Sequence, residues 1–268
     1  MGGGLFLRVL GPLRLERDGQ DVDIGGARQR EVLARLAVAG GQPVTSEALL
    51  ADVWGPATGG PAAASLHVSV SKLRRAIDPD RRARASSPLV STAGGYALAV
   101  GSDATEVEDR ARQAAGLLGA GEFAAAYDEL ADAWASWRGE PYDEVGEHSW
   151  LVHERQRCDD LRTYIAELHA EASLFLGRDA GGVVLDLASL VERHPTRERL
   201  AALLAIALYR DQRQDDALRV LRLTRDHLRD LSGLDPGPDF QLIEQLILAQ
   251  QPDPYAARRL LRRAGTVR

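Results

Sequence analysis

The spacing of apolar residues changes within the first quarter of the chain. Residues 5 to 24 form three short runs in which apolar and polar residues alternate, separated by Gly11-Pro12 and by Asp18-Gly19. Such alternation predicts β-strands, and Asp-Gly between two runs is a hairpin signal. We therefore expect a small sheet at the start of the chain.

Three segments with helical spacing follow this sheet, and they cover residues 27 to 41, 44 to 55 and 65 to 77. Thr45 or Ser46 is the expected N-cap of the second helix. Two further β runs then turn at Gly94-Gly95. The order of sheet, three helices and terminal hairpin predicts a compact α+β domain.

Beyond about residue 103 the pattern is helical throughout. The expected helices cover residues 106 to 137 with a break at Gly119–Gly121, residues 149 to 177, three segments between 180 and 231, and a segment that begins behind Pro238. Proline is favoured in the first turn of a helix. Successive helices joined by short loops predict an all-α, tetratricopeptide-like domain.

Charge is distributed unevenly between these two parts. The chain has a net charge of −6, but residues 1 to 100 hold 12 Lys and Arg against 9 Asp and Glu, whereas residues 101 to 268 hold 21 against 30. A basic half that meets a polyanion and ordinary variation of surface charge both fit this asymmetry. We expect domains at residues 1–102 and 103–252, followed by a basic tail at residues 253–268. The five arginines of that tail fit a solvated helix or a further contact to nucleic acid.

The cellular compartment follows from what the sequence lacks. No apolar run approaches the roughly 18 to 20 residues that span a bilayer, and the N-terminus has no pattern of a secretory signal. Cys158 is the only cysteine, which excludes an internal disulfide and fits a reducing compartment. We therefore expect a cytoplasmic protein with no membrane partner.

The third helix has two different faces. At 100° per residue, one narrow sector contains a core stripe. Its members are Leu66, Val70, Leu73 and Ile77. The opposite sector is small, partly apolar and cationic, and consists of Ala64, Val68, Ser71, Lys72 and Arg75. No acidic residue occurs from Ser65 to Ile77.

This cationic sector is suited to the major groove of DNA. Small residues allow close approach, a valine methyl can contact a thymine methyl, and Ser, Lys and Arg can bind base edges or phosphates. His67 and Arg74 flank the sector and suit contacts to the DNA backbone. The alternative is a solvated helix whose cationic side has no function.

Other chemistry finds little support in the sequence. Lys72 is the only lysine, and no Gly-rich phosphate loop contains it. The six histidines form no metal-binding spacing. Cys158 fits a half-buried apolar residue better than a nucleophile, and Trp54 fits the core. We therefore expect no catalytic residue, metal site or cofactor, and no enzymatic activity.

Several segments resemble known regulators. VTSEALLADVWG resembles the second helix of the winged-helix domain of two-component response regulators, SLHVSVSKLRRAI its recognition helix, and LVSTAGGYAL its wing. Together with FLRVLGPLRL, GGARQREVLARL, WASWRGEP and LDPGPDFQLIEQLIL, these segments resemble the Streptomyces antibiotic regulatory protein family of transcriptional activators. The resemblance covers about residues 5 to 252.

The resemblance implies a winged helix-turn-helix domain followed by a bacterial transcriptional activation domain. It implies binding to direct repeats in promoter DNA of a gene cluster for a secondary metabolite such as an antibiotic, with recruitment of RNA polymerase holoenzyme. One recognition helix reads only a few base pairs, so we expect pairs of protomers side by side on the repeats. No receiver domain precedes residue 5, so we do not expect phosphorylation of an aspartate to be the switch.

The resemblance also assigns residues. It places Lys72, with its neighbours Ser71, Arg74 and Arg75, in or beside the major groove. It places Thr92, Gly94 and Gly95 at the tip of the wing, near the minor groove. The loop before the recognition helix is expected to contact polymerase, and it consists of Gly55, Pro56, Ala57, Thr58, Gly59, Gly60 and Pro61.

A second hypothesis assigns the main function to the acidic helical half. That half would be a protein-interaction scaffold, and the basic domain would bind DNA only without sequence preference. Binding of a protein partner by the helical half would favour this hypothesis.

Overall fold

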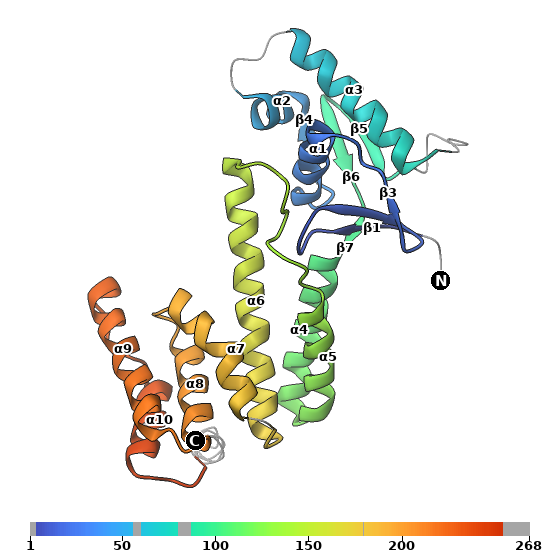
Figure 1. Cartoon of the computed structure of the whole chain (residues 1–268). Coiled ribbons are helices and arrows are strands. Elements are labelled where there is room, and N and C mark those ends of the chain that lie inside the picture. Colours follow the sequence, from blue (N-terminus) through green and yellow to red (C-terminus); the bar gives the residue numbers. More distant parts are fainter. Residues whose placement is uncertain (1–3, 56–59, 80–86, 179, 254–268) are drawn as a thin grey trace. The chain divides into compact units, whose positions relative to one another are not determined.

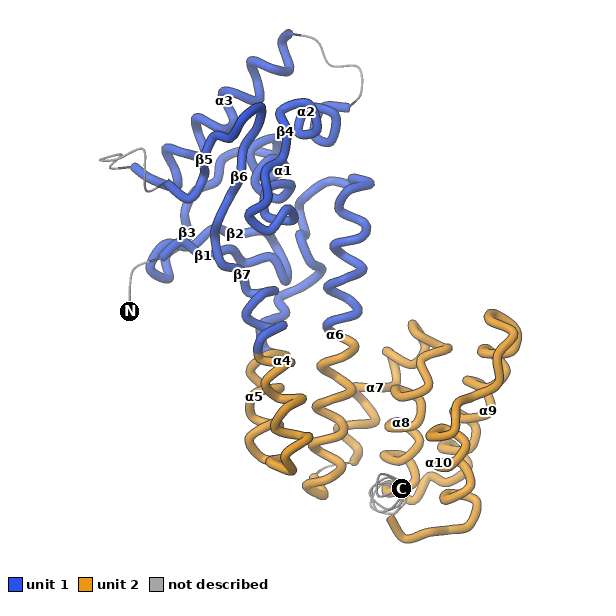
Figure 2. The backbone as a smooth tube through the Cα atoms, turned by 180° about the vertical axis from the view of Figure 1, so that it is seen from behind, with its two compact units in different colours: residues 1–109, 135–161 blue, residues 110–134, 162–268 orange. Residues whose placement is uncertain are grey.

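The computed structural model describes residues 4–55, 60–79, 87–178 and 180–253. Its contacts divide the chain into two compact units (Figure 2). One consists of Met1–Asp109 with Ala135–Leu161, and the other of Arg110–Trp134 with Arg162–Arg268.

The first sheet of unit 1 has four strands in the order β3-β2-β1-β7 (Figure 1). They are β1 (Leu5–Arg8), β2 (Arg14–Arg17), β3 (Gln20–Val22) and β7 (Gly101–Ser102). β2 runs antiparallel to both β1 and β3, whereas β7 runs parallel to β1. The β2–β3 turn has positive φ angles at Asp18 (52°) and Gly19 (78°). Two such residues are what a tight type I′ hairpin turn requires, so the Asp-Gly prediction is confirmed.

Three helices and a second sheet complete the winged-helix region of unit 1. The helices are α1 (Ala27–Val38), α2 (Ser46–Trp54) and α3 (Gly60–Ile77), and each packs against the other two. The second sheet has the order β4-β6-β5, with β4 (Val44–Thr45), β5 (Leu89–Thr92) and β6 (Gly95–Leu98). The Thr45 hydroxyl accepts a hydrogen bond from Ala48 N at 3.1 Å and caps α2.

The described residues from 103 onward form helices and connecting segments, as predicted. The helices are α4 (Asp103–Ala120), α5 (Phe123–Ala135), α6 (Ser149–Phe175), α7 (Ala180–Arg193), α8 (Glu198–Arg210), α9 (Gln214–Ser232) and α10 (Pro238–Leu248). In unit 2, α8 packs against α7, α9 and α10. Every residue of α8 from Leu200 to Leu208 is buried. A helix that is apolar all round is the centre of a core, so α8 is the central helix of this unit.

Candidate nucleic-acid interface

Helix α3 has the two faces that its sequence predicts. Its core stripe is buried, with exposed fractions of 3% or less for all four members: Leu66, Val70, Leu73 and Ile77. The opposite residues are exposed, and they are Ala64, Val68, Ser71, Lys72 and Arg75. The helix is therefore held in unit 1 by one side and presents the cationic side to solvent.

The two cations on the exposed side of α3 do not stabilise the fold through contacts with other described residues. Lys72 and Arg75 form no hydrogen bond or ion pair with any described residue. Other cations of the same unit are paired: the guanidinium of Arg8 lies 3.0 Å from Glu16, and that of Arg35 lies 2.6 Å from Asp52. Because unpaired cations repel each other on a surface, they are more readily explained by an external anion than by the fold.

The C-terminal end of α3 is fixed from the first sheet. Arg17 on β2 donates hydrogen bonds from Nη2 to the carbonyl oxygens of Ala76 (3.0 Å) and Ile77 (2.5 Å). These carbonyls are among the last four of the helix, which lack partners within the helix. A cation also interacts favourably with the negative end of the helix dipole. Arg17 therefore orients the helix that carries the candidate interface.

The β5–β6 hairpin corresponds to the predicted wing. Gly94 is exposed and has φ = 88°. A tight turn requires such a positive φ, which glycine adopts readily because it has no side chain. The Gly94 carbonyl accepts a hydrogen bond from Ser46 N at 2.8 Å. Thr92 is half-buried at the end of β5. The turn is thus anchored to the first residue of α2.

Gly95 has a different environment from the one expected at a wing tip. It is buried opposite Thr45, and a Cβ atom there would lie 2.0 Å from the carbonyl oxygen of Val44. Such a contact is far below van der Waals distance, so only glycine allows β4 and β6 to pair here. The burial of Gly95 argues for a structural role and against direct contact with DNA.

His67 and Arg74 are engaged by the wing. His67 Nδ1 lies 3.1 Å from the hydroxyl of Tyr96, and Arg74 donates hydrogen bonds to Leu89 O (3.2 Å) and Ser91 Oγ (2.8 Å). The sequence predicts that both residues flank the cationic sector, but it does not predict these partners on β5 and β6.

Comparison with known proteins identifies the family. The model of the bacterial transcriptional activator domain matches residues 102–248, and that of the C-terminal transcriptional regulatory protein domain matches residues 19–97. The chain is also 30% identical to the regulatory protein DnrI of Streptomyces peucetius over 92% of this chain and 93% of DnrI. The chain belongs to the Streptomyces antibiotic regulatory protein (SARP) family.

Other SARP relatives are longer than this chain. It is 37% identical to the regulatory protein AfsR of Streptomyces coelicolor over 95% of its own length, but it spans only 25% of AfsR. The solved structure of Mycobacterium tuberculosis EmbR in complex with a low-affinity phosphopeptide is similar over 99% of this chain and 70% of that chain, with a TM-score of 0.82 and 31% identity. The winged-helix region followed by an all-helical region is therefore the SARP arrangement.

The loop predicted to contact polymerase lies partly outside the described residues of this SARP chain. Gly55 ends α2 with φ = 93°, and Gly60 and Pro61 begin α3. Pro56, Ala57, Thr58 and Gly59 lie outside the described residues, as do residues 254–268 of the basic tail. Their predicted contacts stay predictions.

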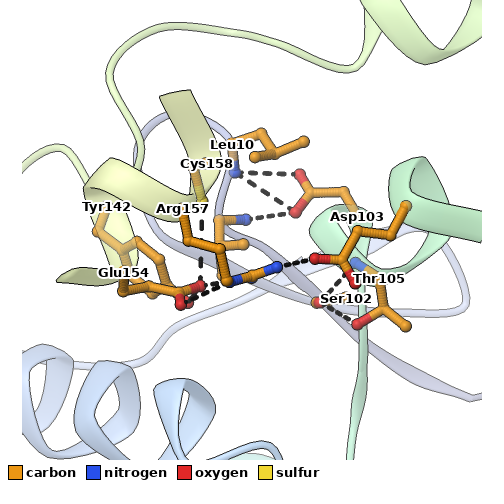
Figure 3. A network of polar contacts seen from close by, with 10 residues as sticks. Leu10, Ser102, Asp103, Thr105, Tyr142, Glu154, Arg157 and Cys158 are labelled. Carbon is orange, nitrogen blue, oxygen red and sulfur yellow. Dashed lines mark hydrogen bonds and ion pairs between the residues drawn. The ribbon is translucent and has the colours of Figure 1, made fainter. Parts of the chain in front are cut away.

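A buried polar network in unit 1 of the SARP chain was missed by sequence reasoning (Figure 3). Asp103, which is 1% exposed, accepts hydrogen bonds from Val9 N at 2.7 Å and Leu10 N at 3.4 Å. The Arg138 guanidinium lies 3.1 Å from the same carboxylate. A buried carboxylate requires such partners. Asp103 therefore ties the chain after β1 to the first turn of α4. The sequence carries no signal for this role, because the two-residue strand β7 that precedes Asp103 is recognisable only in the structure.

The same network includes a protonatable group on α6 (Figure 3). Glu154 accepts hydrogen bonds from the Tyr142 hydroxyl (3.4 Å) and Arg157 (2.7 Å), and Cys158 Sγ lies 3.9 Å away. Burial raises the pKa of Glu154 to about 7, although the hydrogen bonds from Tyr142 and Cys158 oppose this rise. Burial also raises the pKa of the Cys158 thiol to about 12. Cys158 is fully buried, more than predicted, and its high pKa agrees with a packing role.

One prediction about the core was wrong. Trp54 is only half-buried, and the guanidinium carbon of Arg28 on α1 lies 5.6 Å from its ring centroid. Arginine stacks on tryptophan through the charge distribution of the ring. Trp54 therefore joins α2 to α1 near the surface of unit 1.

No group of three or more His, Cys, Asp and Glu side chains that could hold a metal ion occurs in the described part of the SARP chain. No helix of the described residues is long and apolar enough to cross a membrane.

Proposed function

We propose that this SARP-family chain is a sequence-specific DNA-binding activator. In this proposal the exposed side of α3 enters the major groove, with Val68, Ser71, Lys72 and Arg75 towards the bases and phosphates. The wing residues Thr92 and Gly94 lie near the adjacent minor groove. Residues 1–102 bind the DNA, and residues 103–252 act in activation. Ala64 is small and exposed on the same side, and this supports close approach of the helix to the groove.

The observation that carries the proposal is the unpaired state of Lys72 and Arg75 among the described residues. Both are exposed on a helix that contains no acidic residue. Binding of such a cation to a phosphate releases condensed counterions from DNA, and no ion pair with a described residue has to be broken first. The other cations of unit 1 that were described above would lose an internal partner.

A selection of random duplexes by the purified chain, followed by sequencing, tests the proposal. We expect enrichment of a short motif that is repeated at about the spacing of one helical turn. On the selected duplex, Lys72→Ala and Arg75→Ala should each reduce the slope of log K against log salt by about 0.9. Arg14→Ala is the control, because Arg14 is an exposed cation of the same unit that lies 3.6 Å from Asp21. Unchanged affinity and slope in the two α3 variants would show that the wrong face was assigned.

The proposed assembly is a pair of protomers side by side on direct repeats. Its support is the small reading length of a single recognition helix, which is too short for useful specificity. Sedimentation of the protein with a duplex that carries two repeats should give two protomers per duplex. One protomer per repeat pair would contradict this arrangement.

We further propose that the bound activator recruits RNA polymerase holoenzyme to promoters of a secondary-metabolite gene cluster. The proposed contact regions are the helical half and the segment of residues 55–61, whose last two residues are the first two of α3. In transcription reactions with a selected site upstream of a promoter, the full chain should increase the amount of transcript. Tight DNA binding without any increase would contradict recruitment.

A scaffold function of the helical half is the second candidate, and a cavity in unit 2 favours it. This cavity has a volume of about 810 Å³ and is lined by residues of α4, α6, α8 and α10, among them Ala115, Tyr164, Leu203 and Phe240. The lining also includes the charged residues Glu171, Glu198, Arg199 and Asp239. Concave pockets that combine apolar side chains with a few polar groups are common binding sites. In the full chain, Ala115→Arg should then abolish capture of polymerase, and Gln113→Arg on the exposed face of α4 is the matched control. Equal capture by both variants would remove the cavity from consideration.

A further inference from the structure

Two residues of the recognition helix, the exposed His67 and the half-buried Arg74, contact the wing. His67 and Arg74 are seven residues apart, so they lie two turns apart on the same side of α3. Both meet Tyr96 of β6: the Tyr96 hydroxyl lies 3.1 Å from His67 Nδ1, and the Arg74 guanidinium carbon lies 5.6 Å from the Tyr96 ring centroid. Tyr96 itself is buried. It is therefore a fixed point to which the helix is attached at two levels.

Arg74 also reaches the other strand of the hairpin. Its Nε donates to Leu89 O at 3.2 Å, and its Nη2 donates to Ser91 Oγ at 2.8 Å. Ser91 and Tyr96 are directly opposite each other in the β5–β6 ladder. The Arg74 guanidinium thus contacts both strands of the hairpin at one pair of opposite residues, Ser91 and Tyr96, close to the turn at Gly94.

The wing has no charge of its own with which to find DNA. The residues from Leu89 to Gly95 are Leu, Val, Ser, Thr, Ala, Gly and Gly. Contacts made by such residues are hydrogen bonds and van der Waals contacts, which depend on accurate distance. A wing that had to be ordered during binding would cost affinity, and a wing held beforehand avoids that cost.

We propose that His67 and Arg74 are positioning residues that hold the wing at a fixed place relative to the recognition helix, and that Arg74 acts on DNA binding through Ser91 and Tyr96 instead of through a phosphate. This inference rests on the proposed function for its effect on DNA. The clamp itself, formed by His67, Arg74, Ser91 and Tyr96, is a property of the free protein. It refines the expectation that both residues contact the DNA backbone.

The first experiment uses the full chain without DNA. Hydrogen exchange of the backbone amides of β5 and β6 is compared between the unaltered chain, Arg74→Met and Arg75→Met. Methionine keeps a long apolar stem but removes every donor. Arg74→Met removes two hydrogen bonds to the hairpin. Each lost bond of ordinary net strength should increase local opening by about fivefold, so at least that increase is expected in Arg74→Met. Arg75→Met, one residue further on the exposed side, should leave the exchange unchanged. Equal exchange in all three proteins would overturn the clamp.

The second experiment measures DNA binding on a selected duplex over a range of salt concentrations. Arg74→Met should lower affinity several-fold with an unchanged salt slope, whereas Arg75→Met should lower the slope by about 0.9. Ser91→Ala combined with Arg74→Met should cost little more than Arg74→Met alone, because the two residues form one interaction. A reduced slope in Arg74→Met, with additive losses in the double variant, would show that Arg74 binds a phosphate directly.

Tyr96→Phe tests the contact between the Tyr96 hydroxyl and His67, because it removes only the hydroxyl group and keeps the buried ring. Faster exchange in β6 is expected here as well, to a smaller extent than in Arg74→Met. If the chain selects no DNA motif, the proposed function fails, and the exchange experiments still decide on the clamp. If DNA is bound but exchange in the hairpin is the same in every variant, the clamp fails and the proposed function stands.

Discussion

Helices α3 and α9 share a spacing of buried residues, but the cations on their exposed faces differ in whether they have acidic partners. Four buried residues of each helix follow one spacing, i, i+4, i+7 and i+11: Leu66, Val70, Leu73 and Ile77 in α3, and Ala217, Leu221, Thr224 and Leu228 in α9. Helix α3 buries Ser69 in addition. Both helices also carry several cations. On α9 three of the four arginines are paired with acids: Arg219 with Asp216, Arg225 with Glu244 and Arg229 with Asp235. The fourth, Arg222, donates a hydrogen bond to Leu218 O of its own helix. Lys72 and Arg75 of α3 form no such pair with a described residue.

The difference shows that cationic residues on a helix are a weak signal by themselves. Exposed ion pairs contribute little to stability, and an arginine that has an acidic neighbour is already neutralised. The informative feature of α3 is the combination of two cations, Lys72 and Arg75, that have no partner among the described residues, with small residues and without acids. This combination leaves a surface whose charge remains available to an external anion.

The largest effect is expected on stability, when a leucine is truncated on the buried face of either helix. Leu73→Ala in α3 and Leu221→Ala in α9 each remove a side chain with an exposed fraction of 0%. Both should lower the free energy of unfolding by about 2–5 kcal/mol, because each leaves a cavity. Denaturant unfolding of the full chain, followed by circular dichroism, measures this. A loss in only one of the two variants would contradict the comparison of the buried faces.

A smaller effect, on DNA affinity, should distinguish the exposed face of α3 from that of α9. Lys72→Glu and Arg219→Glu change the net charge by the same amount, so any effect of overall charge is matched. Lys72→Glu should weaken binding to a selected duplex by at least about tenfold, or about 1.4 kcal/mol, because a carboxylate then faces phosphates. Arg219→Glu, on an exposed site paired with Asp216, should leave affinity within about twofold. Equal losses would mean that only net charge matters.

The sequence was sufficient for features that depend on local spacing. The two faces of α3 follow from its period, the β2–β3 turn from Asp18-Gly19, and the start of α2 from Thr45. Contacts between distant segments could not be read in this way. Arg74 finds Ser91 and Tyr96, which are 17 and 22 residues away, only after the hairpin has folded back on α3.

Buried polar groups were also beyond sequence reasoning. Asp103 resembles an ordinary exposed acid at the start of a helix, and its burial follows from the parallel pairing of β7 with β1. Gly95 is a second example. Only glycine fits there because β4 comes so close, and the sequence does not reveal that approach. Position in the chain predicted the element that contains each residue, but the packing of other elements determined what each residue does.

The smallest expected effect concerns an exposed apolar residue on each helix. Val68 of α3 and Leu223 of α9 have the same exposed fraction, 52%, so truncation of either to alanine should change stability little. Val68 lies on the side proposed to enter the major groove, where thymine presents its methyl group. Each selected thymine is replaced in turn by uracil, which lacks only that methyl group. At one position this replacement should weaken binding of the unaltered chain by about 1 kcal/mol, roughly fivefold. The Val68→Ala variant should no longer distinguish thymine from uracil there, whereas Leu223→Ala should distinguish them as well as the unaltered chain does. Full discrimination in Val68→Ala at every thymine would place Val68 outside the groove, and would leave Lys72 and Arg75 as contacts to the DNA backbone on a differently oriented helix.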